Sequence, residues 1–227
     1  LPNKTKLHLG KAAWDFKSLF KAMGNGMSEF VNHVSISFVA MLYIYQMLKY
    51  SGEDGVTAFG VIISMNFLFI SICVGYSLGT GSIVSYHYGA KNYRELKSLL
   101  RKNINILLCI GLILTGFSEL LAHPIASLFV SENPKLLEFV KHGFRLYGLS
   151  YLLSGFTIYA SGFFTALNNG IISAIISLAR TFVFQSIAIL VLPLLFGVNG
   201  IFGAVIIAEF LTFLLSYLFI RCYRKKY

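Results

Sequence analysis

The sequence predicts an all-α polytopic membrane protein with six transmembrane helices. Three observations lead to this fold class. Hydrophobic residues make up 56% of the 227 residues and charged residues only 12%, against roughly 25% charged residues in soluble domains. Long segments lack any charge, and one of them runs from Gly55 to Tyr86 without Asp, Glu, Lys, Arg or His. The basic residues gather at the ends of such segments.

The first 26 residues precede the first apolar segment and carry five lysines. Apolar residues from Leu9 to Met23 recur at helical spacing, which predicts a basic amphipathic helix lying on the cytoplasmic leaflet. Gly24-Asn25-Gly26 predicts a break before the chain enters the membrane. We therefore expect residues 1–26 to form a cytoplasmic interfacial linker helix.

Six apolar segments follow, and each approaches or exceeds the roughly 20 residues that a helix needs to cross the hydrocarbon core. Polar, glycine-rich or proline-containing residues separate them. The six-helix transmembrane region is expected over 27–220, with spans at about 27–48, 56–88, 104–122, 144–167, 171–195 and 201–220.

The connections between the spans differ in charge. Residues 49–55 are short and acidic on balance, whereas 89–102 holds five basic residues opposite an apolar stripe. That basic segment is expected either to form a short interfacial helix or to be a solvated loop. Residues 123–142, with two prolines, are expected to be an outer loop, and 221–227 a basic cytoplasmic tail.

The distribution of Lys and Arg predicts the orientation. The segments assigned to the inner side hold 14 of the 19 basic residues, and short cytoplasmic loops are enriched in Lys and Arg. Both termini are therefore expected in the cytoplasm of a multi-pass protein of the plasma (inner) membrane, in contact with the lipid bilayer. The same distribution explains the net charge of +10 without nucleic acid as a partner.

Several classes of protein do not fit the sequence. The three cysteines have neither CxxC nor Cys/His spacing, so neither a disulfide framework nor a metal site is expected. No nucleophile and base pair, metal spacing or phosphate loop indicates an enzyme or a bound cofactor. Because the chain begins Leu-Pro-Asn-Lys, without an initiator Met, we expect it to be a piece of a longer protein.

The end of the second span carries a specific motif. Val84 to Arg94 reads Val-Ser-Tyr-His-Tyr-Gly-Ala-Lys-Asn-Tyr-Arg and resembles the signature that ends the second helix of each half of the MATE (multidrug and toxic compound extrusion) transporters. Its central residues are Gly89, Ala90, Lys91 and Asn92. The resemblance implies one six-helix lobe of a twelve-helix transporter. The basic linker before the first span resembles the entry to the C-terminal lobe.

The resemblance also implies a function. It is secondary active efflux of small organic, often cationic, drugs and toxic compounds across a bacterial plasma membrane by antiport with Na⁺ or H⁺ as the coupling ion. The partner would be the other lobe or a second copy. Two alternatives are a lipid-linked oligosaccharide flippase of the same superfamily, which should have a more cationic cavity, and a six-helix scaffold that transports nothing.

Ionisable residues within spans are the default candidates for a transport site, because an unpaired charge in the bilayer is costly. Glu29 and His33 are four residues apart in the first span, with Asn32 beside them, so they could form a proton or sodium site on one helix face. A structural alternative is that Glu29 stabilises the start of the helix. Sodium-coupled relatives also carry an Asp on the fourth span, and residues 147–167 contain no acid.

Two further charges lie deep in the last spans. Arg180 and Glu209 are each about nine or ten residues into their spans, which places both near the midplane at 1.5 Å per residue. They are expected to meet as a structural ion pair that joins the fifth and sixth helices. The alternative is that they contact the substrate. Asn66, Gln185 and Tyr159 are the uncharged candidates for a cavity-facing position.

Overall fold

The computed structural model describes residues 15–130 and 133–223, and it describes their side chains except those of residues 17–32. Every regular element in these ranges is helical, which confirms the all-α class. The elements are α1 (Phe16–Gly89), α2 (Tyr93–Val130), α3 (Pro134–Gly148), α4 (Tyr151–Ala166), α5 (Gly170–Leu178), the π-helix η1 (Ala179–Phe184) and α6 (Gln185–Tyr223).

Two of these helices are sharply folded at a glycine. In α1, Gly52 has φ 64° and ψ −153°, and in α6, Gly197 has φ 56° and ψ −133°. Residues with a side chain rarely adopt such φ values, whereas glycine does so at little cost. A straight helix of 74 residues would be about 110 Å long against a hydrocarbon core of about 30 Å. Folding at the glycine turns α1 into two membrane-length arms.

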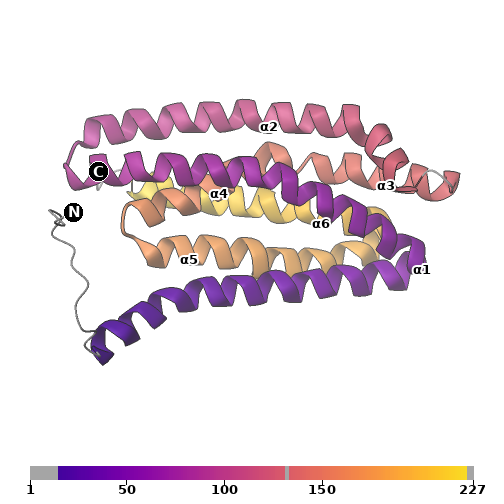
Figure 1. Ribbon diagram of the computed structural model, residues 1–227. Helices are drawn as coiled ribbons and strands as arrows, with labels where there is room; N and C mark the ends of the chain where they lie inside the picture. The colour runs from indigo at the N-terminus through magenta and orange to yellow at the C-terminus, as the bar shows by residue number, and fades with distance from the viewer. Residues whose placement is uncertain (1–14, 131–132, 224–227) are drawn as a thin grey trace, which may run out of the picture.

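The described chain therefore runs back and forth six times. Three helical segments are long and apolar enough to cross a membrane, His33–Gly89, Tyr93–Val130 and Gly170–Tyr223. The first and last fold back on themselves at Gly52 and Gly197, so each supplies two crossings. The consecutive helices α3 and α4 supply the remaining one (Figure 1).

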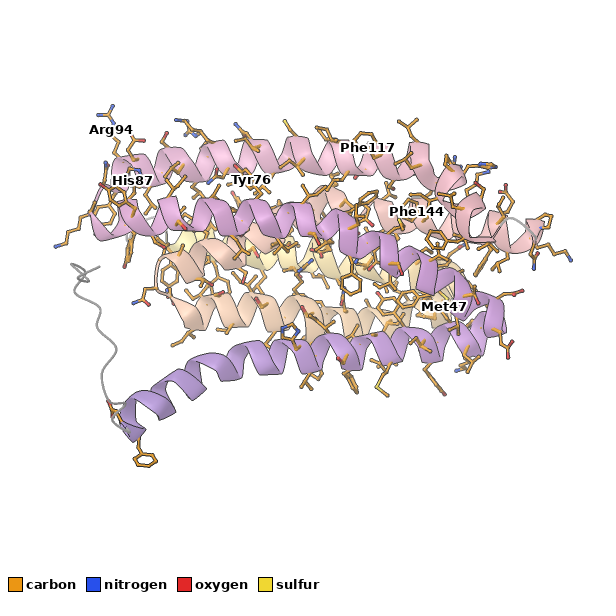
Figure 2. The ribbon with its side chains drawn as sticks, in the orientation of Figure 1. Met47, Tyr76, His87, Arg94, Phe117 and Phe144 are labelled. Atoms are coloured by element: carbon orange, nitrogen blue, oxygen red, sulfur yellow. The ribbon has the colours of Figure 1, made fainter. Side chains whose placement is uncertain are left out.

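The turns between the crossings alternate between two ends of the molecule. The α1–α2 and α4–α5 connections and the C-terminal end of α6 lie at one end, and the folds within α1 and α6 lie at the other (Figure 1). Figure 2 shows His87 and Arg94 at the first end and Met47 near the second. The basic residues between Lys91 and Lys102 are thus gathered at one end, as positive-inside topology requires.

Packing centres on α4, most of whose residues are buried or half-buried. One aromatic cluster includes Phe69, Phe144 and Tyr151. A second includes Phe163 and Phe164 near the basic end. Apolar side chains also cover the outside, and Leu120 and Leu194 are 75% and 71% exposed, which suits contact with lipid.

The expected linker helix over residues 1–26 differs from the structure where the chain is described. Helix α1 begins at Phe16 and continues through Gly24 and Gly26 without a break. Glycine inside a helix costs about 1 kcal/mol relative to alanine but does not forbid the helix. The predicted break was therefore wrong, while residues 1–14 lie outside the described part of the chain.

The basic segment after Gly89 is helical, but it is not a separate element. Helix α2 begins at Tyr93 and runs uninterrupted into the third crossing. Neither glycine nor proline occurs between Tyr93 and Ile110 to end it. An interfacial helix followed by re-entry at Ile104 was therefore an incorrect prediction.

The expected outer loop over 123–142 is mostly helical as well. Helix α2 passes through Pro124 to Val130, since neighbouring groups in a bundle can replace the hydrogen bond that proline removes. Helix α3 then begins at Pro134, and Asn133 Oδ1 accepts hydrogen bonds from the next two free backbone N–H groups. The fourth span, expected as one helix over 144–167, is interrupted at Leu149 and Ser150.

Candidate functional site

The fifth and sixth crossings are joined by an ion pair between Arg180 and Glu209. Arg180 Nη2 and Nε both donate to Glu209 Oε1, at 2.6 Å and 2.8 Å. The Glu209 side chain is 2% exposed and the Arg180 side chain 23%. A charge inside the membrane is costly unless it is paired or hydrated. The pairing predicted from the depth of these residues is confirmed.

Thr157 of α4 satisfies the second oxygen of the same carboxylate. Its hydroxyl Oγ1 lies 2.6 Å from Glu209 Oε2, and Thr157 is fully buried. Both carboxylate oxygens therefore accept a hydrogen bond, as a buried charge requires. The ion pair links three elements, because the threonine, the arginine and the glutamate come from α4, η1 and α6.

A short π-helical segment carries the arginine. Residues Ala179–Phe184 form η1 between α5 and α6. Such segments are rare and occur frequently at functional sites, because the wider turn changes which residues face a neighbouring helix. Arg180 and the next residue, Thr181, both line the cavity described below.

A cavity of about 680 Å³ lies between α1, α4, α5 and η1. Among the described residues that line it, Arg180 carries the one charged side chain, and every other polar side chain is a hydroxyl. The hydroxyl side chains are Ser77, Ser82, Ser85, Thr157, Ser161, Thr165, Ser173, Ser177 and Thr181. Its volume is in the range of small-molecule sites.

The hydroxyls on α4 and α5 are bonded to one another. Ser161 Oγ lies 2.9 Å from Ser173 Oγ and 2.8 Å from Ser177 Oγ. Thr165 Oγ1 lies 2.7 Å from Ser173 Oγ. A hydroxyl can donate or accept by rotating its proton, so this wall could bind groups of either polarity.

The other predicted residues lie away from this cavity or outside the described side chains. His33 is exposed on α1, and Asn66 and Gln185 are half-buried. None of the three is among the residues that line the cavity. The side chains of Glu29 and Asn32 lie outside the described residues, so their grouping with His33 stays a prediction.

The signature turn forms the connection between α1 and α2. Lys91 has φ 55°, its N–H donates to Tyr88 O at 3.0 Å, and the Asn92 N–H donates to His87 O at 2.9 Å. This pair of bonds is the Schellman arrangement that ends many helices. Asn92 Oδ1 then accepts from Glu95 N at 3.2 Å and caps α2. The motif is thus a compact reversal, with Gly89 and Ala90 leading into it.

The candidate Tyr159 does not line the hydroxyl-rich cavity but belongs to a second polar cluster between α1, α2 and α4, which was not predicted from the sequence. Tyr76 OH donates to Asn103 Oδ1 and Asn103 Nδ2 donates to Tyr159 OH, both at 2.7 Å. Asn103 is 5% exposed. The amide directly before the apolar span at 104–122 was a usable signal. For the cavity, the signal was the stripe Thr157, Ser161 and Thr165, which repeats at helical spacing.

Comparison with known families finds that the MatE family model matches residues 29–192. No curated protein sequence matches the chain. The matched range includes every residue that lines the hydroxyl-rich cavity.

Solved structures match the fold closely at low sequence identity. The outward-facing form of a multidrug resistance MATE family transporter of the MOP superfamily aligns with a TM-score of 0.86 and 22% identity, covering 97% of this chain and 49% of that one. The inward-facing form aligns with a TM-score of 0.86 and 22% identity, covering 94% and 50%. A MOP superfamily transporter from Pyrococcus furiosus aligns with a TM-score of 0.81 and 22% identity, covering 88% and 45%. The chain spans about half the length of these proteins.

Proposed function

Because this chain belongs to the MatE family, we propose that it is one six-helix lobe of a transporter that exports small organic compounds. The other lobe would be supplied by further sequence of the same protein or by a second copy of this chain. The coverage of about half of each solved transporter supports this arrangement. The basic linker favours the C-terminal lobe, with both chain ends in the cytoplasm.

The hydroxyl-lined cavity is the observation that carries the proposal. It lies inside the lobe and within the residues that the family model matches. Its wall combines hydroxyls with apolar side chains such as Ile70 and Val74, the mixture expected of a site for organic molecules. In the proposed mechanism, this cavity is part of the substrate path.

The lobe is proposed to move as a unit during transport. It aligns equally well with outward-facing and inward-facing forms of one transporter family, at a TM-score of 0.86 in both cases. A rocking motion between two lobes would leave the fold of each lobe unchanged. The ion pair of Arg180 and Glu209 supports this role, since it ties α4, η1 and α6 together.

The proposed coupling site is elsewhere, around Glu29 and His33 in the first crossing. Glu209 is buried and already bonded to Arg180 and Thr157, so it suits a structural role better than the binding of an incoming cation. Re-entry of Na⁺ or H⁺ at Glu29 would neutralise a carboxylate and bias the lobe toward one conformation.

One observation favours a second candidate, transport of an anionic substrate such as a lipid-linked saccharide. The charged residue of the cavity wall is Arg180, which is a cation, and its carboxylate partner lies behind it. The similar transporter from Pyrococcus furiosus is described as having a binding pocket of reverse polarity, which suggests a different function for that protein. An arginine on the wall can donate hydrogen bonds to a phosphate group, whereas it offers no acceptor to an organic cation.

Transport assays with the full-length protein in proteoliposomes separate the two candidates. We expect ethidium to move against its gradient when a Na⁺ or H⁺ gradient is imposed, and Glu29→Gln to reduce that movement. Glu138→Gln at the opposite end is the matched control, because Glu138 is exposed and its partner is the neighbouring Lys141. Gradient-independent flipping of a fluorescent lipid-linked oligosaccharide, with no ethidium movement, would replace the first candidate by the second. If the protein shows neither ethidium export nor lipid flipping, both candidates are rejected.

A further inference from the structure

A groove of about 620 Å³ separates α2 from α6 at the basic end of the molecule. Its α2 wall carries Lys97, Arg101 and Lys102, and its α6 wall carries Tyr217 and Ile220. Among the described residues, no Cα of α2 lies within 8 Å of a Cα of α6. The two helices therefore stand apart along this groove, which shares no lining residue with the hydroxyl-lined cavity.

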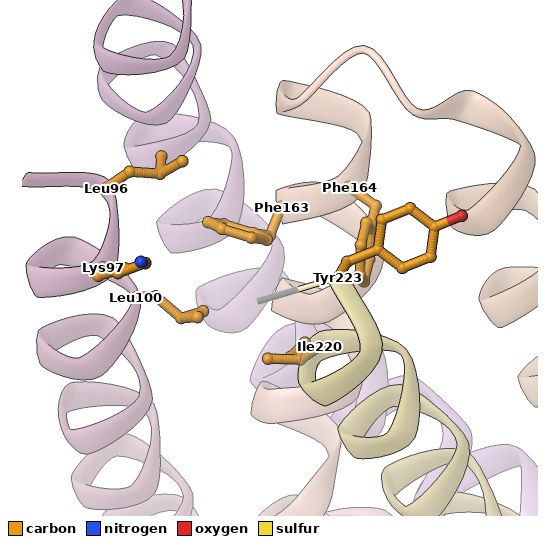
Figure 3. A pocket seen from close by; sticks show the side chains of 7 residues that line it. All are labelled: Leu96, Lys97, Leu100, Phe163, Phe164, Ile220 and Tyr223. Carbon is orange, nitrogen blue, oxygen red and sulfur yellow. The ribbon is translucent and has the colours of Figure 1, made fainter. Parts of the chain in front are cut away.

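The groove adjoins an apolar pocket. Phe163 and Phe164 of α4, together with Leu100 and Ile220, line this pocket. Figure 3 shows the Phe163 ring between the two helices, with the Lys97 ammonium directed toward the gap. Deeper along the same helices, Leu108 and Leu214 are 53% and 42% exposed. The groove is thus cationic at its end and apolar below.

The three cations of the groove have no carboxylate partner among the described side chains. The ion pairs within the described part of the chain join other residues. Lys97 and Arg101 are one helical turn apart, and Lys102 follows directly, so all three lie within about 8 Å along the helix axis. Such a cluster at headgroup depth can bind a phosphate, and Tyr217 could donate a further hydrogen bond.

We propose that this groove is a binding site for an anionic phospholipid. The phosphate would lie among Lys97, Arg101 and Lys102, and an acyl chain would follow the apolar walls of α2 and α6 into the bilayer. The charge of the groove and its continuation into lipid-facing side chains select this occupant over a zwitterionic lipid. The site goes beyond the proposed transport function, because it lies outside the substrate cavity.

Tryptophan quenching by brominated lipids tests the proposal in the full-length protein. Tyr217→Trp is introduced after every native tryptophan, including Trp14, is replaced by phenylalanine. In phosphatidylcholine vesicles, brominated phosphatidylglycerol should bind near this residue about five-fold or more tightly than brominated phosphatidylcholine, which is the effect of one nearby cation. At Leu120→Trp, near the other end of α2, the two lipids should quench alike.

Substitutions identify the groups that hold the lipid. Replacing Lys97, Arg101 and Lys102 together by Gln should remove the preference at residue 217. Arg94→Gln is the control, because Arg94 belongs to the same end and points away from the bundle (Figure 2). The three positions are exposed, so the triple variant should keep its elution profile, and Arg101→Lys should keep the preference.

Two outcomes would overturn the proposal. Equal loss of preference in the triple variant and in Arg94→Gln would indicate diffuse surface charge. Failure of both brominated lipids to quench residue 217 would show that protein covers the groove.

Discussion

Lys91 and Asn168 adopt the same left-handed backbone conformation, with φ of 55° and 57°, in the two turns at the basic end of the molecule. In each turn the residue donates to a carbonyl three residues back, and the next residue donates to a carbonyl five back. The α1–α2 and α4–α5 connections are therefore closed by the same hydrogen-bond pattern. The signature motif marks one of them, and Asn168-Asn169 the other.

These turns predict a gain in stability from glycine. Lys91→Gly and Asn168→Gly should each stabilise the protein by about 0.5–1 kcal/mol, because glycine adopts positive φ without the penalty of a Cβ. Thermal unfolding in detergent measures the effect. Asn169→Gly is the control, since its φ is −107°, and it should not stabilise. A loss of stability in both Lys91→Gly and Asn168→Gly would contradict the assigned conformation.

The buried ion pair predicts an asymmetric response to mutation. Arg180→Met alone leaves Glu209 buried and without its cation, which should cost about 3–5 kcal/mol. Replacing Arg180 by Met and Glu209 by Leu together should reduce the free energy of unfolding much less than the sum of the two single changes. Unfolding of the four proteins of this double-mutant cycle gives the coupling. Additive losses would mean that the two side chains act independently.

Asn103 predicts a smaller but measurable coupling. Asn103→Ala removes its hydrogen bonds to Tyr76 and Tyr159, and hydrogen bonds between membrane helices contribute about 0.6–1.7 kcal/mol. The combination with Tyr159→Phe should be less destabilising than the sum of the single effects. Asn105→Ala on the same helix is exposed and should be nearly neutral. An equal loss at both asparagines would rule out the network as the cause.

Gly111 lies where the backbones of α2 and α4 are in close contact. A Cβ added at Gly111 would lie 2.9 Å from Tyr151 O and 3.2 Å from Leu152 Cα, which are backbone atoms. Gly111→Ala should therefore destabilise the protein by about 1–3 kcal/mol through overpacking. Gly116 on the same helix has open space around its Cβ position, so Gly116→Ala should be neutral or slightly stabilising. The reverse order would show that the helices are not in this close contact.

Much of the fold could be predicted because hydrophobic length and charge placement are local properties of the sequence. The same properties placed Arg180 and Glu209 at a common depth. Some predicted helix boundaries were wrong. Helix α1 continues through Gly24 and helix α2 continues through Pro124, where helix propensity predicted an interruption. The roughly 1 kcal/mol that a single glycine costs is too small to end a long helix by itself.

The hydroxyl-lined cavity was harder to predict for a physical reason. Its hydroxyls come from four elements, and a serine or threonine in an apolar helix can equally bond its own backbone, as Thr80 and Thr212 do. The π-helical turn that presents Arg180 left no recognisable pattern in the sequence. Only the spacing of Thr157, Ser161 and Thr165 on one helix face pointed toward a shared wall.

Cysteine accessibility tests most directly the claim that the chain crosses the membrane repeatedly with its basic end in the cytoplasm. Single cysteines at Asn92 and Asn133, at opposite ends of α2, are introduced after Cys73, Cys109 and Cys222 are replaced by alanine. A membrane-impermeant maleimide added to intact cells should label Asn133→Cys and leave Asn92→Cys unlabelled until the membrane is permeabilised. Labelling of Asn92→Cys from outside, with Asn133→Cys protected, would contradict the orientation and the transport direction built on it.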